Sequence, residues 1–169
     1  NINLLVKSKK NNELISLKNL ISDYAKSINR SDTIDILSKS NIRDDFVMIS
    51  IMMGNDYLPK LGCISYDKLW KLYWSYIKII NKDDTLIKDG MFNQQLMSNF
   101  MLLVYKNLQE NYKKISPNSY NFKRTKSYLD GLIWCLNMYQ TGKCPKYDYM
   151  YYGTKSPNPY ELLFYLSSE

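Results

Sequence analysis

An almost unbroken apolar segment constrains the fold of this chain more than any other feature of its sequence. Residues 46–53 read Phe-Val-Met-Ile-Ser-Ile-Met-Met, and Ser50 is the only polar residue among them. A helix that is apolar all round is buried on every side, whereas a membrane span needs roughly 18 apolar residues or more. The segment therefore predicts a core helix. Gly54-Asn55-Asp56, with Pro59 just beyond, predicts where that helix ends.

The rest of the chain predicts further helices and one hairpin. Two short apolar-rich segments, 2–7 and 13–17, flank a polar turn and predict a β-hairpin at the N-terminus. Apolar residues at helical spacing, with capping residues before them, predict helices over 17–28, 66–80, 93–114, 127–140 and from Pro159 onward behind Asn158. The pattern favours a weaker helix near 32–39, a loop over 81–90 and a polar connection over 116–126. We therefore expect a mainly α-helical chain.

The start of the apolar helix carries two neighbouring carboxylates. Asn41 is placed as its N-cap, and Asp44 and Asp45 would then lie near the positive end of the helix dipole. We interpret both as charges of the helix N-terminus and assign them no chemistry.

Residue counts exclude several classes of site. The chain has no histidine, which excludes a Ser-His-Asp triad and a His-ligated metal site. Three scattered cysteines, Cys63, Cys135 and Cys144, cannot form a four-Cys zinc site and match no disulfide framework. Reduced thiols in an intracellular compartment, cytoplasmic or nuclear, are therefore expected. Lys+Arg of 23 against Asp+Glu of 16 leaves a net charge of +7, which suits a polyanionic partner without identifying one.

Asp56 is the candidate for chemistry. The glycine turn is expected to deliver this carboxylate from the protein interior, and a buried carboxylate needs a cation or hydrogen-bond donors beside it. A Mg²⁺ ion meets that need, because hard cations bind oxygen ligands. Hydrogen bonds from N–H groups of the turn itself also meet it, as they often do for Asp and Asn side chains. The spacing alone leaves both interpretations open.

Two blocks of the sequence resemble a known family. Residues 44–59, Asp-Asp-Phe-Val-Met-Ile-Ser-Ile-Met-Met-Gly-Asn-Asp-Tyr-Leu-Pro, resemble the signature of the Xrn family of 5′→3′ exoribonucleases, which ends in Gly-Asn-Asp-Phe-Leu-Pro. Tyr128-Leu-Asp-Gly-Leu-Ile-Trp134 is similar to the family's Tyr-Val-Glu-Gly-Leu-Gln-Trp. Residues 142–157 correspond to an aromatic-rich stretch of the family, with Tyr147 and Tyr149 at its two Trp positions. Two ordered blocks are more specific than either alone.

The sequence differs from the family pattern at several positions. Besides the two tyrosines that replace tryptophans, Thr154 stands where the family has His and Tyr152 where it has Pro. The connection before Tyr128 is also shorter than in the large cellular enzymes. These departures imply a compact, divergent member, for which a virus with an A/T-rich genome is one source.

The resemblance implies a fold and an activity. The chain would be a helical segment of an α/β (PIN/FEN-like) nuclease, with 1–60 the end of the nuclease core and 61–169 a helical extension that carries the aromatic loop 147–152. The implied activity is hydrolysis of RNA from its 5′ end with Mg²⁺, or Mn²⁺ in its place. Asp56 would be both a metal ligand and a catalytic residue. The other acidic ligands would belong to an N-terminal nuclease portion of the same protein, so the chain alone is expected to be inactive.

The aromatic loop and nearby lysines are candidates for contact with RNA. Stacking of a base on an aromatic ring is worth about 1–3 kcal/mol and accepts any base. Tyr147 or Tyr149 would stack a base of single-stranded RNA with a 5′ monophosphate, and Lys60 and Lys146 would meet phosphate. Alternatively, the tyrosines pack over the core with their hydroxyls bonded at its rim. No membrane partner is expected.

Two other functions remain open. One is a degenerate, non-catalytic relative that binds RNA or a protein. The other is a flap-type DNA nuclease, against which the downstream aromatic block argues, because flap nucleases resemble only the first block.

Overall fold

A computed structural model describes residues 3–7, 12–16, 40–81, 84–109 and 121–168. The chain divides into two compact units, Asn1–Arg43 and Asp44–Glu169. In the first unit, β1 (Asn3–Lys7) and β2 (Asn12–Ser16) pair antiparallel, with Asn3 opposite Ser16. The predicted N-terminal hairpin is therefore confirmed. The helices expected over 17–28 and near 32–39 lie outside the described residues.

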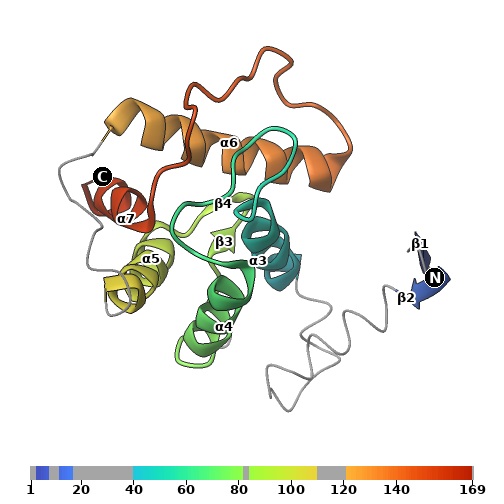
Figure 1. Ribbon diagram of the computed structural model, residues 1–169, viewed down its shortest axis with the longest axis horizontal. Helices are drawn as coiled ribbons and strands as arrows, with labels where there is room; N and C mark the ends of the chain where they lie inside the picture. The colour runs from blue at the N-terminus through green and yellow to red at the C-terminus, as the bar shows by residue number, and fades with distance from the viewer. Residues whose placement is uncertain (1–2, 8–11, 17–39, 82–83, 110–120, 169) are drawn as a thin grey trace. The chain divides into compact units, whose positions relative to one another are not determined.

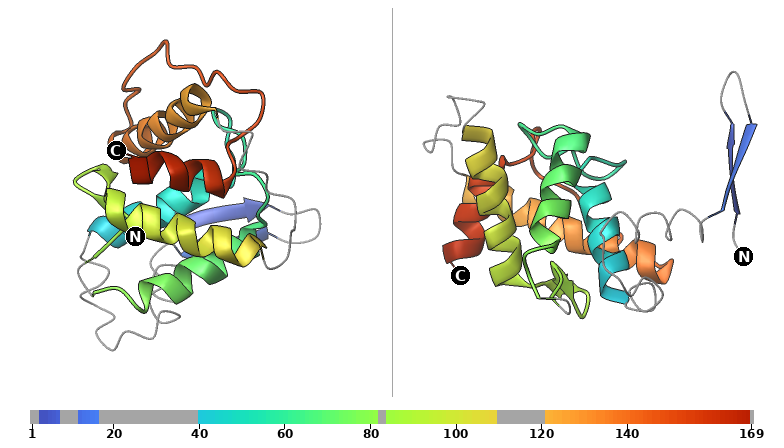
Figure 2. Two further views of the ribbon diagram at one scale, coloured as in Figure 1. Left: turned by 90° about the vertical axis from the view of Figure 1, so that its left-hand side faces the viewer. Right: turned by 90° about the horizontal axis from the view of Figure 1, so that it is seen from below.

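The second unit is built almost entirely of helices, which confirms the expected mainly α-helical class. Its elements in chain order are α3 (Ser40–Ile51, which begins in the last residues of the first unit), α4 (Tyr66–Ile77), β3 (Ile87–Lys88), β4 (Met91–Phe92), α5 (Gln94–Gln109), α6 (Phe122–Thr141) and α7 (Pro159–Ser168). Helix α7 packs along α5 and also contacts α6, while α4 packs against α5 (Figure 1; Figure 2). Among the described residues, no helix combines the length and the apolar character that a membrane crossing requires.

The apolar segment of α3 lies in the core on one side only. Met48, Ile49 and Met52 are fully buried, whereas Phe46 and Val47 are half-buried within the described part of the chain. The expectation of burial on every side is therefore wrong for the face of α3 that carries these two residues.

The start of α3 also differs from the expectation. The helix begins at Ser40, one residue before the expected cap, and its first turn holds no acidic residue. Asp45 is instead fully buried. Its carboxylate accepts hydrogen bonds from the Tyr73 hydroxyl (2.9 Å) and from the N–H groups of Leu86 (3.0 Å) and Ile87 (2.8 Å). The interpretation of Asp45 as a helix N-terminal charge is wrong, because contacts with α4 and the 86–87 segment bury it.

A short hairpin, β3–β4, begins within the region expected to be a loop, 81–90, and its second strand lies just beyond that region. Ile87 pairs with Phe92 and Lys88 with Met91, so the connection is the dipeptide Asp89-Gly90. Both residues have positive φ, 53° and 74°, as a type I′ turn requires. Asp-Gly between two short segments that each carry an apolar residue is a strong hairpin signal, which the expectation of a loop did not take into account.

The cap of α4 agrees with the expectation, whereas the start of α6 differs from it. The side chain of Ser65 caps α4 by accepting the N–H of Lys68, as expected. Helix α6 begins at Phe122, five residues before the expected start, because the side chain of Asn121 caps it. Gly142 ends α6 in the left-handed conformation, with φ 68°.

Candidate functional site

The turn after α3 depends on a glycine. Gly54 has φ +96°, and a Cβ atom there would lie 3.0 Å from the backbone nitrogen of Lys60. The chain doubles back at this point, and the N–H of Leu61 donates to the carbonyl of Met52 at 2.7 Å. A side chain at position 54 would force these two stretches of backbone apart.

Asn55 closes the turn and fixes it to α6. Its Oδ1 accepts the N–H groups of Tyr57 (2.9 Å) and Leu58 (2.8 Å). Its Nδ2 lies 3.4 Å from the Sγ of Cys135 and 3.3 Å from the hydroxyl of Tyr139. Burial raises the pKa of the Cys135 thiol, and the hydrogen bond from Asn55 opposes that rise only in part. One interpretation of the sequence had the Asp56 carboxylate accept the N–H groups of this turn. In the structure the side chain of Asn55 accepts them instead.

Asp56 itself is exposed. Within the described part of the chain, no hydrogen bond or ion pair engages its carboxylate. The expectation that the turn delivers this carboxylate from the interior is therefore wrong, since the turn projects it outward. Asp56 remains available to a ligand.

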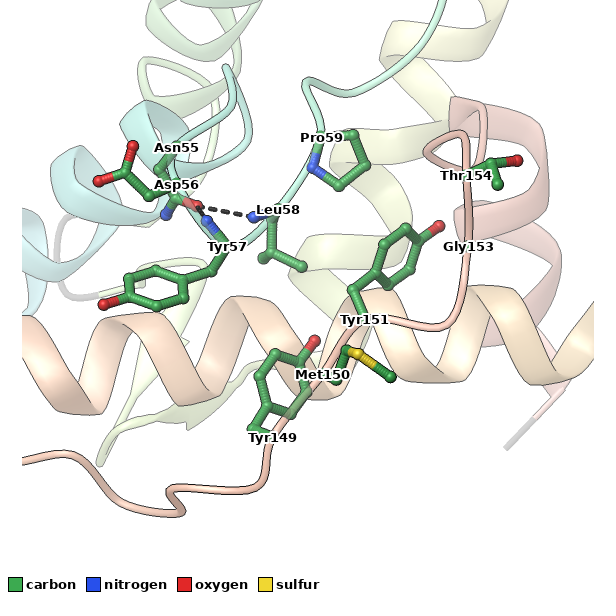
Figure 3. Close-up of a pocket in the computed structure, with 10 residues that line it drawn as sticks. All are labelled: Asn55, Asp56, Tyr57, Leu58, Pro59, Tyr149, Met150, Tyr151, Gly153 and Thr154. Carbon is green, nitrogen blue, oxygen red and sulfur yellow. Dashed lines mark hydrogen bonds between the residues drawn. The ribbon is translucent and has the colours of Figure 1, made fainter.

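Asp56 borders a surface hollow of about 390 Å³. One wall of the hollow is formed by residues 55–59, and the other by Tyr149, Met150, Tyr151, Gly153 and Thr154 (Figure 3). The structure thus places the Gly-Asn-Asp turn against the aromatic segment that follows α6, although the two are far apart in sequence.

Tyr149 is a packed residue of this wall. Its ring stacks on the indole of Trp134, with 4.9 Å between ring centroids and 24° between planes. Its hydroxyl donates to the carbonyl of Ser127 at 3.0 Å. Burial raises the pKa of Tyr149 to about 12. These contacts favour the alternative in which Tyr149 packs over α6 with its hydroxyl bonded.

Tyr151 packs in a similar way. Its ring meets that of Tyr128 edge-on, at 5.8 Å between centroids. Its hydroxyl donates to the carbonyl of Lys155 at 2.7 Å. Two of the loop tyrosines therefore hold the loop against the helix.

The other predicted contact residues lie outside the hollow. Tyr147 is 93% exposed, and within the described residues its ring meets no other aromatic ring. Lys146 is exposed with its Nζ 3.6 Å from Asp148, and its carbonyl accepts the indole N–H of Trp134 at 3.0 Å. Lys60 is exposed just past the turn. The structure therefore brings Asp56 and Tyr149 to one hollow but not Tyr147, Lys146 or Lys60.

Sequence reasoning missed one residue of the site. Tyr57 lines the hollow, is 47% exposed, and meets the indole of Trp134 edge-on at 4.9 Å between centroids. Its position directly after Asp56 was the available signal. Its half-exposure could not be foreseen, because that exposure depends on how Trp134 packs.

The carboxylate of Asp56 could serve as one ligand of a metal ion. An exposed, unpaired carboxylate is a ligand that Mg²⁺ accepts. Among the described residues, no group of three or more His, Cys, Asp or Glu side chains gathers that could hold a metal ion. A complete site would therefore need carboxylates from outside this part of the chain.

A scan of the chain against models of protein families gives no match. A search among curated proteins gives no match either.

Proposed function

We propose that this chain is the helical segment of a Mg²⁺-dependent 5′→3′ exoribonuclease of the Xrn type, belonging to an α/β (PIN/FEN-like) nuclease. It would contribute Asp56 to the metal site and an aromatic wall to the substrate path. Single-stranded RNA with a 5′ monophosphate is the proposed substrate. The N-terminal nuclease portion of the same protein would supply the remaining carboxylates.

One observation carries the proposal. Asp56 and the aromatic segment from Tyr149 to Thr154 border the same hollow, and both belong to stretches of sequence that carry the resemblance to the family. A carboxylate held at the mouth of an aromatic-walled hollow suits a nuclease, which must place a phosphodiester beside a metal and hold the adjacent bases.

Each residue of the turn has a separate part in this function. Gly54 and Asn55 fix the backbone so that Asp56 projects outward. Asp56 would hold Mg²⁺, which when bound activates water and stabilises charge on phosphate oxygens. Lys60, exposed just beyond the turn, would attract the phosphate backbone.

The test is degradation of a 5′-monophosphorylated RNA by the full polypeptide that contains these residues, with Mg²⁺ and with EDTA. Asp56→Asn is compared with Asp67→Asn, which changes an exposed carboxylate in the first turn of α4. Loss of residues that merely support metal ligands costs about 10–100-fold, so removal of a ligand should lower the rate by about 100-fold or more. Asp67→Asn should leave the rate unchanged.

The alternatives give different results. Metal-dependent decay that survives Asp56→Asn would remove Asp56 from the metal site. RNA binding without decay would indicate a non-catalytic relative. Cleavage of flap DNA in preference to single-stranded RNA would indicate the flap-type nuclease.

A further inference from the structure

We propose that the ring of Tyr57 is the platform on which a base of single-stranded RNA stacks beside Asp56. The inference rests on the proposed function and assigns a substrate contact that neither the sequence pattern nor the resemblance supplies. It follows from the exposure, position and support of this ring.

Tyr57 is held next to Asp56 with its ring accessible. It is 47% exposed and lines the hollow. The hydrogen bond from its N–H to Asn55, at 2.9 Å, fixes its backbone within the turn. Figure 3 shows the Tyr57 ring and the Asp56 carboxylate pointing to the same side of the turn. A base on this ring would bring its own phosphate close to that carboxylate.

The Tyr57 ring is also supported by contact with other aromatic rings. It meets Trp134 at 4.9 Å and 68° between planes, and Trp134 in turn stacks on Tyr149, whose hydroxyl is bonded to Ser127. Such a chain of three rings restricts Tyr57 before any ligand arrives. A platform ordered in advance loses less conformational entropy when a base binds.

The candidates from the family positions are less suited to this role. Tyr149 has a face against Trp134 and its hydroxyl engaged. Tyr147 is 93% exposed, and no described ring supports it, so binding would have to order the side chain first. Tyr57 combines accessibility with support.

An exposed tyrosine against a tryptophan is not by itself a binding site, and the chain offers a matched control. Tyr66 is 51% exposed and meets Trp70 edge-on, at 6.0 Å and 64°. It shares the residue type, a similar exposure and an edge-on contact with a tryptophan, but it lies on α4 and does not line the hollow that Asp56 borders. A difference between the two positions therefore reports the site and not the residue type.

The experiment measures the Kd of a 3′-fluorescein, 5′-monophosphorylated octauridine by fluorescence anisotropy. It uses the full polypeptide that contains the chain, in EDTA so that a metal-dependent activity cannot consume the RNA. Tyr57→Leu keeps an apolar side chain but removes the aromatic face, whereas Tyr57→Phe keeps the face. We expect Tyr57→Leu to raise the Kd by about 5-fold or more. Tyr57→Phe and Tyr66→Leu should stay within about 2-fold of the unaltered protein.

Two results would overturn the inference. One is a Kd for Tyr57→Leu within about 2-fold of the Kd of the unaltered protein. The other is an equal loss for Tyr66→Leu and Tyr57→Leu. If degradation by the unaltered protein is intact in either case, only the stacking role falls. If the unaltered protein neither binds nor degrades the RNA, the proposed function falls with it.

A second measurement leaves the protein unaltered and covers the case in which Tyr57→Leu does not fold. Octauridine carrying 5-iodouracil is irradiated in the complex, and the crosslinked residue is identified by mass spectrometry. A crosslink at Tyr57 supports the inference. Crosslinks confined to Tyr147 or Tyr149 overturn it.

Discussion

The hydroxyl of Tyr149 lies against α6 at Gly131, so close that a Cβ atom on Gly131 would lie 1.9 Å from the hydroxyl oxygen. The same Cβ would lie 2.7 Å from a methyl carbon of Leu58, which belongs to the turn after α3. Gly131 is therefore the point at which the aromatic segment, the helix and the turn meet. Both walls of the hollow can approach α6 here because glycine has no side chain.

Gly131→Ala is expected to destabilise the protein. Alanine is favoured over glycine within a helix by about 1 kcal/mol, but overpacking a close contact costs about 1–3 kcal/mol. Tyr149 would also lose its bond to Ser127 and its stack on Trp134. We expect a net loss of about 1–2 kcal/mol in urea unfolding, and a smaller loss when Tyr149→Phe is present. A gain in stability of about 1 kcal/mol, as helix propensity alone predicts, would mean that a Cβ atom at position 131 fits beside Tyr149 and Leu58 without cost.

The local parts of this fold could be predicted from local patterns. The end of α3 just before the Gly54 turn, the capping of α4 by Ser65 and the start of α7 behind Asn158 follow from residues next to each other in sequence. The β3–β4 turn had an equally local signal in Asp89-Gly90. What a local pattern cannot supply is which side chain another element covers.

The site illustrates that limit. The sequence predicts Asp45 as a charge of the helix N-terminus and Asp56 as a carboxylate delivered from the interior, and the structure contradicts both expectations. Asp45 is buried by residues from α4 and the 86–87 segment, whereas the turn lifts Asp56 outward. The approach of the aromatic segment to Asp56 was expected only through the resemblance, because no spacing in the sequence encodes it.

Asp45→Ala is expected to be among the most destabilising single changes in the chain. It removes the acceptor of three hydrogen bonds, from Tyr73, Leu86 and Ile87, inside the core. Each buried donor left without an acceptor costs about 1–3 kcal/mol, so a loss of about 3 kcal/mol or more is expected in urea unfolding. The neighbouring Asp44→Ala, at a half-buried position, should cost less than about 1 kcal/mol. Equal effects of the two changes would contradict this account.

Asp45 also predicts a pH dependence of stability. Burial raises the pKa of Asp45 from 3.8 to about 7, although the three hydrogen bonds that its carboxylate accepts oppose that rise. The folded state then keeps a proton that the unfolded state releases above about pH 4. The contribution of this group to the unfolding free energy is therefore fully present below about pH 4 and is lost as pH rises through about 7.

The measurement is the urea unfolding free energy from about pH 4 to about pH 8, for the unaltered chain and for Asp45→Asn. Asparagine does not titrate, so the difference between the two proteins isolates the carboxyl group. The unaltered chain should lose stability relative to Asp45→Asn as pH rises. A relative gain would show that the hydrogen bonds outweigh burial.

The buried ion pair between Arg124 and Glu161 is expected to matter far more than the exposed one on α6. Glu161 is 2% exposed, binds Arg124, and accepts the N–H of Asn158 at 2.9 Å in the cap of α7. Removing one partner of a buried pair costs about 3–5 kcal/mol. Because Arg124 is partly exposed, we expect Glu161→Ala to lie near the lower end of that range.

Asp130→Ala is the matched control, since Asp130 pairs with Lys126 at 2.7 Å on the exposed side of α6. Exposed pairs one helical turn apart contribute about 0.5 kcal/mol or less. Raising the salt concentration should weaken the exposed pair more than the buried one. Comparable losses of stability for Glu161→Ala and Asp130→Ala would show that burial does not separate the two pairs.

Tyr147 and Tyr149 occupy equivalent positions in the resemblance but different environments in the structure, and stability should separate them. Tyr147→Ala removes an almost fully exposed ring and should change the unfolding free energy by less than about 0.5 kcal/mol. Tyr149→Ala removes the stack on Trp134 and the bond to Ser127, and should cost about 2 kcal/mol or more. Tryptophan fluorescence gives a second readout, because loss of Tyr149 exposes the indole of Trp134 and shifts the contribution of this one of the three tryptophans to longer wavelength. If Tyr147→Ala proved the more destabilising change, the aromatic segment would be held to α6 by a different tyrosine from the one described.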